Sequence, residues 1–394
     1  MEFRFTDEQL MIRDTAQQFL AEVSTSEAIR TAMASEHGYD AQLWQQICQD
    51  LVWPALHIPE QYEGMGLGYV ELVAMVEQMG RYLLCSPFFA TVCLGVNSLL
   101  VAGTDAQKAR WLPQLAAGKT ATLAWCDGRA AERGGCWDAN AIGATATATG
   151  NDFILDGEYR YVVDGASADV LILAARLAGS TGSQGVSLFV VPADTAGITR
   201  DLLPALDQTR RQAALRLDKV RVSADTLMAQ PGQAAAALQT ILDLATVALA
   251  AEQMGGAQQC LDMAVAYTKE RSQFGRSIAS FQAIKHKAAD MMLRAEVARS
   301  GVYYAACVAQ EALEGGPLAT ELAEAASIAK SYCSDAYFKN AGECLQMHGG
   351  VGFTWEYDVH LHFKRAKASE HFLGTGAYHR ERLAQHLLDQ EAAE

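Results

Sequence analysis

Two arginines, two glutamines and two phenylalanines lie within twelve residues in the C-terminal half of the chain, in the stretch RSQFGRSIASFQ at 271–282. The guanidinium of Arg271 can pair with phosphate oxygens through two parallel hydrogen bonds, which a lysine cannot do. Phe274 offers a flat apolar surface, and Gln282 offers a donor and an acceptor to a base or a ribose. These residue types predict a nucleotide-binding segment. An ordinary turn between helices, with an ion pair between Glu270 and Arg271, would use the same residues.

A glycine-rich segment, QMHGGVGFTWEYDVHLHFKRAK, begins about 75 residues after Arg271 and spans 346–367. Gly349 and Gly350 would let a ligand approach the backbone closely, although one such glycine pair is a weak signal. His360 and His362 have the spacing HxH, but residues two apart on a helix point to different sides. Because no cluster of cysteines or carboxylates accompanies them, no metal site is predicted.

The elements that must position these motifs form three segments, and the predicted fold class is α+β. Residues 1–121 read as an N-terminal helical domain, with Thr6 and Thr104 as helix N-caps and a break at Pro113. Residues 122–230 alternate between apolar and polar and predict a central antiparallel β-barrel or sandwich domain. Residues 231–394 contain long helical stretches that are apolar on most sides, as in a C-terminal four-helix bundle shared between subunits.

The composition limits the class of protein. A chain of 394 residues with half of them hydrophobic predicts a multi-domain globular protein. The net charge of −15 argues against nucleic-acid binding. The nine cysteines form no CxxC pair, as expected for thiols in a reducing compartment, and the N-terminus does not read as a signal peptide. We found no apolar run that predicts a membrane span and therefore expect a cytoplasmic protein with no membrane partner.

The two motifs together resemble the acyl-CoA dehydrogenase family. The likeness covers nearly the whole chain, including IPEQYEGMGLGYVELVAMVEQMG, GTDAQKARWLPQLAAGKTATLAW and GEYRYVVDGASADVLILAAR. It implies an α–β–α fold, an FAD cofactor, and oxidation of an acyl-CoA by loss of an α-proton to a glutamate and of a hydride to the flavin. In that family each FAD lies between two subunits. The contacts from the neighbouring subunit would fall here on Arg271, Gln273, Phe274, Gln282, Gln346, Met347, His348, Gly349 and Gly350.

The chain departs from the family at the catalytic base. One family position for the glutamate falls on Leu373 and the other on Ala245, and neither side chain can accept a proton. Loss of a positioned base costs roughly 10²–10⁴-fold in rate. Glu252 shares a helical face with Ala245, but seven residues correspond to about 10.5 Å along the axis. Glu370 is expected to face solvent, so no catalytic residue is predicted in this chain.

The contacts to the flavin ring also depart from the family, whereas the contacts across the subunit interface match it. The hydroxyl and amide donors around the ring are replaced by Cys126, Val163 and Ala377. This asymmetry resembles one subunit of the heteromeric α2β2 acyl-CoA dehydrogenases of bacterial steroid degradation. The predicted partner is a homologous subunit that carries the glutamate. A bulky or steroid acyl-CoA is the predicted substrate, and an electron-transferring flavoprotein is the predicted acceptor.

Two other functions use the same fold. In the first, the chain is a homomeric flavin-dependent oxygenase or oxidase. Such an enzyme also lacks the glutamate, but it needs its own pocket for the flavin ring. Alternatively it would be a non-catalytic scaffold subunit that binds CoA or flavin. The retained Arg271 and Gln346 argue against the scaffold, because a scaffold does not need donors for phosphate and nucleotide.

Overall fold

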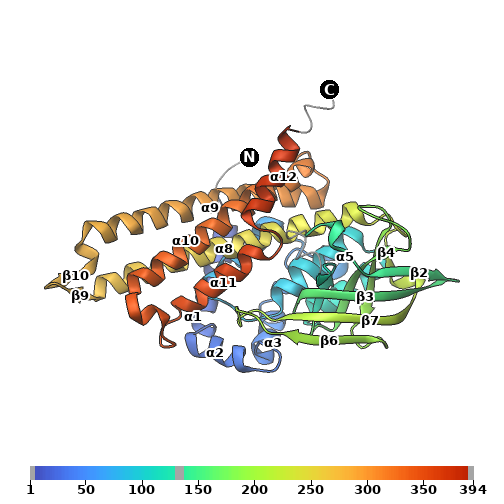
Figure 1. Ribbon diagram of the computed structural model, residues 1–394, viewed down its shortest axis with the longest axis horizontal. Coiled ribbons are helices and arrows are strands. Elements are labelled where there is room, and N and C mark those ends of the chain that lie inside the picture. Colours follow the sequence, from blue (N-terminus) through green and yellow to red (C-terminus); the bar gives the residue numbers. More distant parts are fainter. Residues whose placement is uncertain (1–4, 129–136, 389–394) are drawn as a thin grey trace. The chain divides into compact units, whose positions relative to one another are not determined.

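The computed structural model describes residues 5–128 and 137–388 (Figure 1). It has N-terminal helices, a mostly antiparallel central sheet and a C-terminal helical bundle, which confirms the predicted fold class. The chain forms two compact units, which combine segments distant in sequence. One unit contains Met1–Thr31, Tyr69–Leu84 and Thr246–Glu394, and the other contains Ala32–Gly68 and Cys85–Ala245. The boundaries at 121 and 230 remain predictions.

The two predicted N-caps are confirmed. The hydroxyl of Thr6 accepts from the Gln9 amide at 3.2 Å in a capping box at the start of α1. Thr104 forms the same arrangement with Gln107 at the start of α6. The predicted break at Pro113 is wrong, because buried Trp111, Leu112 and Leu115 hold the helix against the core on both sides of the proline. The N-terminal elements are α1 (Asp7–Val23), α2 (Ser26–Ala34), α3 (Ala41–Gln49), α4 (Tyr69–Arg81), η3 (Phe89–Val96), α5 (Asn97–Ala102) and α6 (Asp105–Ala116).

The central sheet has the strand order β6-β7-β3-β2-β4-β5-β8, with β1 paired to β4. Most neighbours are antiparallel, but β1 and β2 both pair with β4 in parallel, so the expectation of antiparallel strands is wrong at these two places. Alternation of apolar residues reports which face a side chain occupies and not the direction of the neighbouring strand. The strands are β1 (Ala121–Ala124), β2 (Thr145–Thr149), β3 (Asp152–Val163), β4 (Val170–Leu177), β5 (Val186–Pro192), β6 (Ile198–Leu203), β7 (Gln212–Ser223) and β8 (Leu227–Met228).

The C-terminal bundle is built on α8 (Ala235–Glu270), α9 (Gln282–Glu314) and α10 (Leu322–His348), with α11 (Val359–His371) and α12 (Gly376–Leu388) packed against α10. Within the described residues, α8 is the one helix whose length and composition would let it cross a membrane. An 18-residue window of α8 has a mean hydropathy of 1.4, and 72% of that window is buried inside the protein. Such burial is typical of a core helix.

Helices α4 and α8 are in backbone contact. A Cβ on Gly80 would lie 2.0 Å from the Glu252 carbonyl oxygen, and a Cβ on Gly255 would lie 1.8 Å from the Glu77 carbonyl oxygen. Neither position has room for a side chain. The two glycines therefore set how closely these helices approach.

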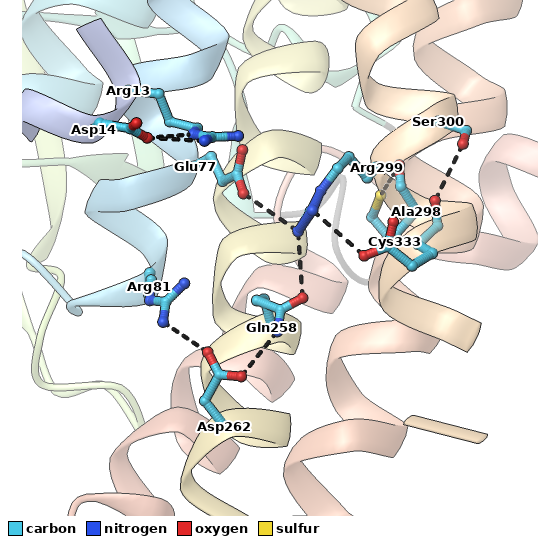
Figure 2. Close-up of polar contacts among 11 residues, drawn as sticks. Arg13, Asp14, Glu77, Arg81, Gln258, Asp262, Ala298, Arg299, Ser300 and Cys333 are labelled. Atoms are coloured by element: carbon cyan, nitrogen blue, oxygen red, sulfur yellow. Dashed lines mark hydrogen bonds and ion pairs between the residues drawn. The ribbon is translucent and has the colours of Figure 1, made fainter. Parts of the chain in front are cut away.

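A polar layer lies beside this contact (Figure 2). Arg299 of α9 reaches the Glu77 carboxylate at 3.5 Å and the Gln258 side-chain oxygen at 3.3 Å. Arg81 pairs with Asp262 at 2.7 Å. Burial raises the pKa of Glu77, and the neighbouring arginines oppose that shift. The layer ties α4, α8 and α9 together through charges rather than through apolar packing.

Candidate functional site

The predicted nucleotide-binding segment forms a short hairpin between α8 and α9. Strands β9 (Ser272–Gln273) and β10 (Arg276–Ser277) pair antiparallel, and Phe274 and Gly275 form the tip with φ of 55° and 76°. The φ of Gly275 lies in the left-handed region, which glycine adopts without strain, and this explains why a glycine occupies the position. Phe274 is 92% exposed. Arg271 and Gln273 are exposed as well, so the hairpin presents its guanidinium, amide and ring outward.

Other residues hold the hairpin in shape. The hydroxyl of Ser277 donates to the Thr268 carbonyl at 2.9 Å, and the Ile278 amide donates to the Arg271 carbonyl at 2.9 Å. The guanidinium of Arg276 lies 4.1 Å from the centroid of the Phe281 ring. The guanidinium of Arg271 takes part in none of these contacts and is accessible to a ligand.

The glycine motif begins where α10 ends. Gln346 is exposed, and Gly349 has a φ of 64°. A Cβ on Gly349 or Gly350 would meet nothing within 4 Å, so the backbone there is open to a ligand. Met347 and His348 are buried at 6% and 5% exposure. Their side chains support the loop, which the sequence could not distinguish from contact with a ligand.

The two motifs meet through an aromatic contact that the sequence reasoning missed. The ring of Tyr267, one helical turn before Arg271, stacks on the ring of His348 with centroids 4.2 Å apart. This contact brings the C-terminal ends of α8 and α10 together. Gln282 is exposed at the first residue of α9, beside the hairpin. Exposed donors next to open glycines fit a dinucleotide that approaches from outside the chain.

The two positions of the family's base hold buried apolar side chains. Leu373 is 2% exposed, and Ala245 is fully buried in α8. Leu373 lies in the turn between α11 and α12 with a φ of 58°. Its carbonyl accepts a hydrogen bond from Nε2 of His379 at 2.8 Å, and Nδ1 of His379 lies 3.2 Å from the Ser327 hydroxyl. Neither position offers a group that removes a proton.

The nearby carboxylates have other partners. Arg365 Nη1 donates to Glu252 Oε1 at 3.0 Å inside the bundle. Lys367 pairs with Glu370 at 2.9 Å, and the side chain of Glu370 is 23% exposed. The structure therefore gives no support to either carboxylate as a substitute base.

A buried lysine holds the turn that carries Leu373. Lys330 Nζ donates to the carbonyls of Ser369, Glu370 and Gly374 at 3.0–3.2 Å and to the Ser334 hydroxyl at 2.8 Å. Burial lowers the pKa of Lys330 to about 7. Four acceptors around one nitrogen favour the charged ammonium, which has three protons to donate. The turn keeps a defined shape although its central residue is a leucine.

Two of the three residues that replace the family's ring contacts, Cys126 and Val163, lie in the unit with the sheet, and the third, Ala377, is exposed on α12 in the other unit. Val163 is 1% exposed and Cys126 is 3% exposed. The Cys126 thiol donates to the Asp127 carbonyl at 3.3 Å. Trp125 is buried and donates to the Trp137 carbonyl at 3.3 Å. These side chains supply no hydroxyl donor and do not fit the polar edge of a flavin ring, whereas the outward-facing set does fit a nucleotide.

The HxH pair is engaged in packing. His362 Nδ1 lies 2.9 Å from the hydroxyl of Tyr337, and His360 meets Trp355 edge to face with ring centroids 4.6 Å apart. Across the described ranges 5–128 and 137–388, no three His, Cys, Asp or Glu residues are arranged to hold a metal ion.

Comparison with known proteins identifies the family of this chain. The family model of the acyl-CoA dehydrogenase N-terminal domain matches residues 6–119, and that of the C-terminal domain matches residues 234–388. This chain belongs to the acyl-CoA dehydrogenase family. The family's members are FAD-dependent oxidoreductases that act on acyl-CoA, so FAD is the cofactor.

Three similar proteins illustrate the membership. The acyl-CoA dehydrogenase IpdE2 of Mycobacterium tuberculosis is 34% identical over 367 residues, which cover 93% of each chain. The butyryl-CoA dehydrogenase of Megasphaera elsdenii has a TM-score of 0.89 at 28% identity, covering 98% of this chain and 100% of the other. The structure of a variant of the Tcur3481-Tcur3483 steroid acyl-CoA dehydrogenase has a TM-score of 0.85 at 28% identity, covering 98% and 99%.

Proposed function

We propose that this chain is the subunit without the catalytic base in a heteromeric FAD-dependent acyl-CoA dehydrogenase. A homologous partner supplies the catalytic glutamate and the pocket for the flavin ring. One observation carries the proposal: both family positions of the base, Leu373 and Ala245, hold buried apolar side chains. A chain with no base and no ring donors still presents five of the predicted nucleotide contacts outward, namely Arg271, Gln273, Phe274, Gln282 and Gln346.

In this proposal the chain holds a flavin that belongs to its partner. FAD, when bound, accepts the hydride from the acyl group. The guanidinium of Arg271 would hold the pyrophosphate, because its N–H groups match phosphate oxygens. Phe274 would cover an apolar part of the cofactor, and Gly349 and Gly350 would allow the backbone amides to approach it. Gln273, Gln282 and Gln346 supply amide donors and acceptors, and Met347 and His348 fix the loop from inside.

The substrate in this proposal is a bulky acyl-CoA such as a steroid acyl-CoA. The similarity to a steroid acyl-CoA dehydrogenase supports that class. A complex in which one chain type lacks a ring pocket has half the usual number of flavin sites and more room for a large acyl group. We assign the electron acceptor as an electron-transferring flavoprotein and the location as the cytoplasm.

The flavin content of the purified protein tests the proposal. Expressed alone, the chain is expected to carry little FAD and to oxidise no acyl-CoA. Co-expressed with a homologue that carries the glutamate, it is expected to give a yellow complex with about one flavin for every two chains, measured by absorbance. One flavin per chain in the isolated protein would instead favour a homomeric oxygenase or oxidase.

A pair of matched arginine variants tests the residue assignment. Arg271→Ala should remove flavin from the complex and leave its assembly, measured by size-exclusion chromatography, intact. Arg276→Ala is the control, because its guanidinium lies over the ring of Phe281, the residue before α9, and is not assigned to the cofactor. Wild-type flavin occupancy in the Arg271→Ala complex would refute the role of Arg271.

A further inference from the structure

An apolar groove lies between α8 and α9 on the surface of the bundle. Its volume is about 460 Å³, and its apolar lining comes from Leu261 and Val265 of α8 and from Ala288, Ala289 and Met292 of α9. The side chain of Met292 is 58% exposed. None of these residues belongs to the nucleotide contacts proposed above, so the groove has no role in that site.

The exposed face of α9 next to the groove is apolar as well. Leu293 is 63% exposed and Val297 is 43% exposed. Together with Ala289 they recur every four residues, so they form one ridge along the helix. A contiguous apolar surface rimmed by polar residues is typical of an interaction site. A groove between two helices beside such a ridge matches the apolar face of a third helix.

Carboxylates flank the ridge on both sides and indicate which kind of chain it binds. Asp290 and Glu296 are exposed, and the helical repeat places them on opposite sides of Leu293. If two copies of this chain packed antiparallel about Leu293, Asp290 of each copy would face Glu296 of the other. Opposed like charges, in a chain of net charge −15, disfavour that pairing. The ridge instead fits a chain with lysine or arginine beside its apolar stripe.

We propose that this groove and ridge bind an amphipathic helix of the homologous partner subunit, with basic residues on both sides of its apolar stripe. The proposal rests on the proposed function and adds where the partner is held. Lys269, at one end of the groove, lies two residues before Arg271, and Met292 lies about 15 Å along α9 from Gln282. A partner whose flavin meets Arg271 and Gln282 brings its own chain to this end of the groove.

Retention of the partner on an affinity resin tests the proposal. A tagged form of this chain is co-expressed with the untagged homologue that carries the glutamate, and the homologue retained with it is quantified. Leu293→Glu should reduce retention at least about tenfold, because it places a charge on the apolar ridge. Met11→Glu is the matched control, since Met11 is 64% exposed on α1 and lies outside the groove. Circular dichroism should show both variants folded as the wild type is.

Charge reversal tests the chemistry of the partner separately. Asp290 is used because Glu296 already has Arg299 of the same helix at 3.4 Å. Asp290→Lys should also reduce retention about tenfold, whereas Asp290→Glu should keep it at the wild-type level. Full retention in Asp290→Lys would overturn the assignment of a basic partner helix.

The remaining outcomes separate this proposal from the proposed function. Full retention in Leu293→Glu, with a wild-type complex present, would overturn the binding surface and leave the heteromeric function standing. No retention by the wild-type chain would overturn both. A dimer of the wild-type chain alone that Leu293→Glu converts to a monomer, measured by light scattering, would assign the groove to a second copy and also overturn the proposal.

Discussion

Arg365 of α11 donates a hydrogen bond to Glu252 of α8 over 3.0 Å, and the two side chains are only 2% and 4% exposed. This ion pair uses the carboxylate that lies two helical turns beyond Ala245. A buried carboxylate held in an ion pair with a guanidinium is not free to act as a base on a substrate. The relationship explains why the nearest glutamate on α8 does not replace the missing base.

Removing one partner of this pair should cost more than removing both. Arg365→Met leaves the Glu252 carboxylate buried without its guanidinium, at a cost of about 3–5 kcal/mol in the free energy of unfolding. The double variant Arg365→Met/Glu252→Leu should recover most of that loss, because neither charge remains. Urea denaturation of the three proteins measures both effects. A double variant no more stable than Arg365→Met would contradict this account.

Two helical glycines should respond oppositely to alanine. Gly255→Ala places a Cβ 1.8 Å from the Glu77 carbonyl oxygen, so α4 and α8 must separate, and we expect a loss of about 2–3 kcal/mol. Gly301→Ala is the control on α9, where a Cβ meets nothing within 4 Å. That change should stabilise the protein by up to about 1 kcal/mol, because alanine is the better helix former. Thermal unfolding followed by circular dichroism distinguishes the two signs.

The features that sequence predicted correctly are those set by neighbours along the chain. Thr6 and Thr104 were predictable as N-caps because each cap depends on a residue three positions later. The turn at Gly275 follows the same rule, because its φ of 76° is left-handed and glycine adopts such a φ without strain. The parallel pairing of β1 with β4 was not predictable, because it joins strands about 50 residues apart.

The candidate site was predictable in its residue types and not in their surroundings. The sequence identified Arg271 and Gly349 from their chemistry and spacing. It could not show that Met347 and His348 face the interior, since α10 packs on several sides and has no single polar face. It also missed Lys330, because a lone lysine in an alanine-rich helix reads as a surface residue until the α11–α12 turn is placed beside it.

Acid should destabilise the protein through its buried histidines. Burial lowers the pKa of His57 to about 4 and those of His362 and His379 to about 3. The unfolded chain therefore binds protons near pH 6.5 that the folded chain does not, so stability is full above about pH 7 and falls as the pH drops. Each histidine lowers the free energy of unfolding by up to about 1.4 kcal/mol for every pH unit below 6.5.

Urea denaturation at pH 7.0 and pH 5.5 measures this dependence. His379→Gln should reduce the difference between the two pH values, whereas His286→Gln, at an exposed position on α9, should leave it unchanged. Equal stability of the wild-type protein at both pH values would show that these histidines are protonated in the folded state.

Lys330 should hold the turn around Leu373 through its charge and not through its bulk. Lys330→Met keeps most of the side-chain volume but leaves the carbonyls of Ser369, Glu370 and Gly374 without this donor, which should cost about 3 kcal/mol. Lys339→Met, at an exposed position on the same helix, is the matched control and should change stability by less than about 0.5 kcal/mol.

Hydrogen exchange distinguishes a local effect of Lys330 on this turn from a general loss of packing. The amides of 372–379 should exchange faster in the Lys330→Met protein, while those at the centre of α9 keep their wild-type rates under native conditions. Faster exchange spread evenly over the bundle would mean that Lys330 stabilises the whole unit and does not specifically fix the turn.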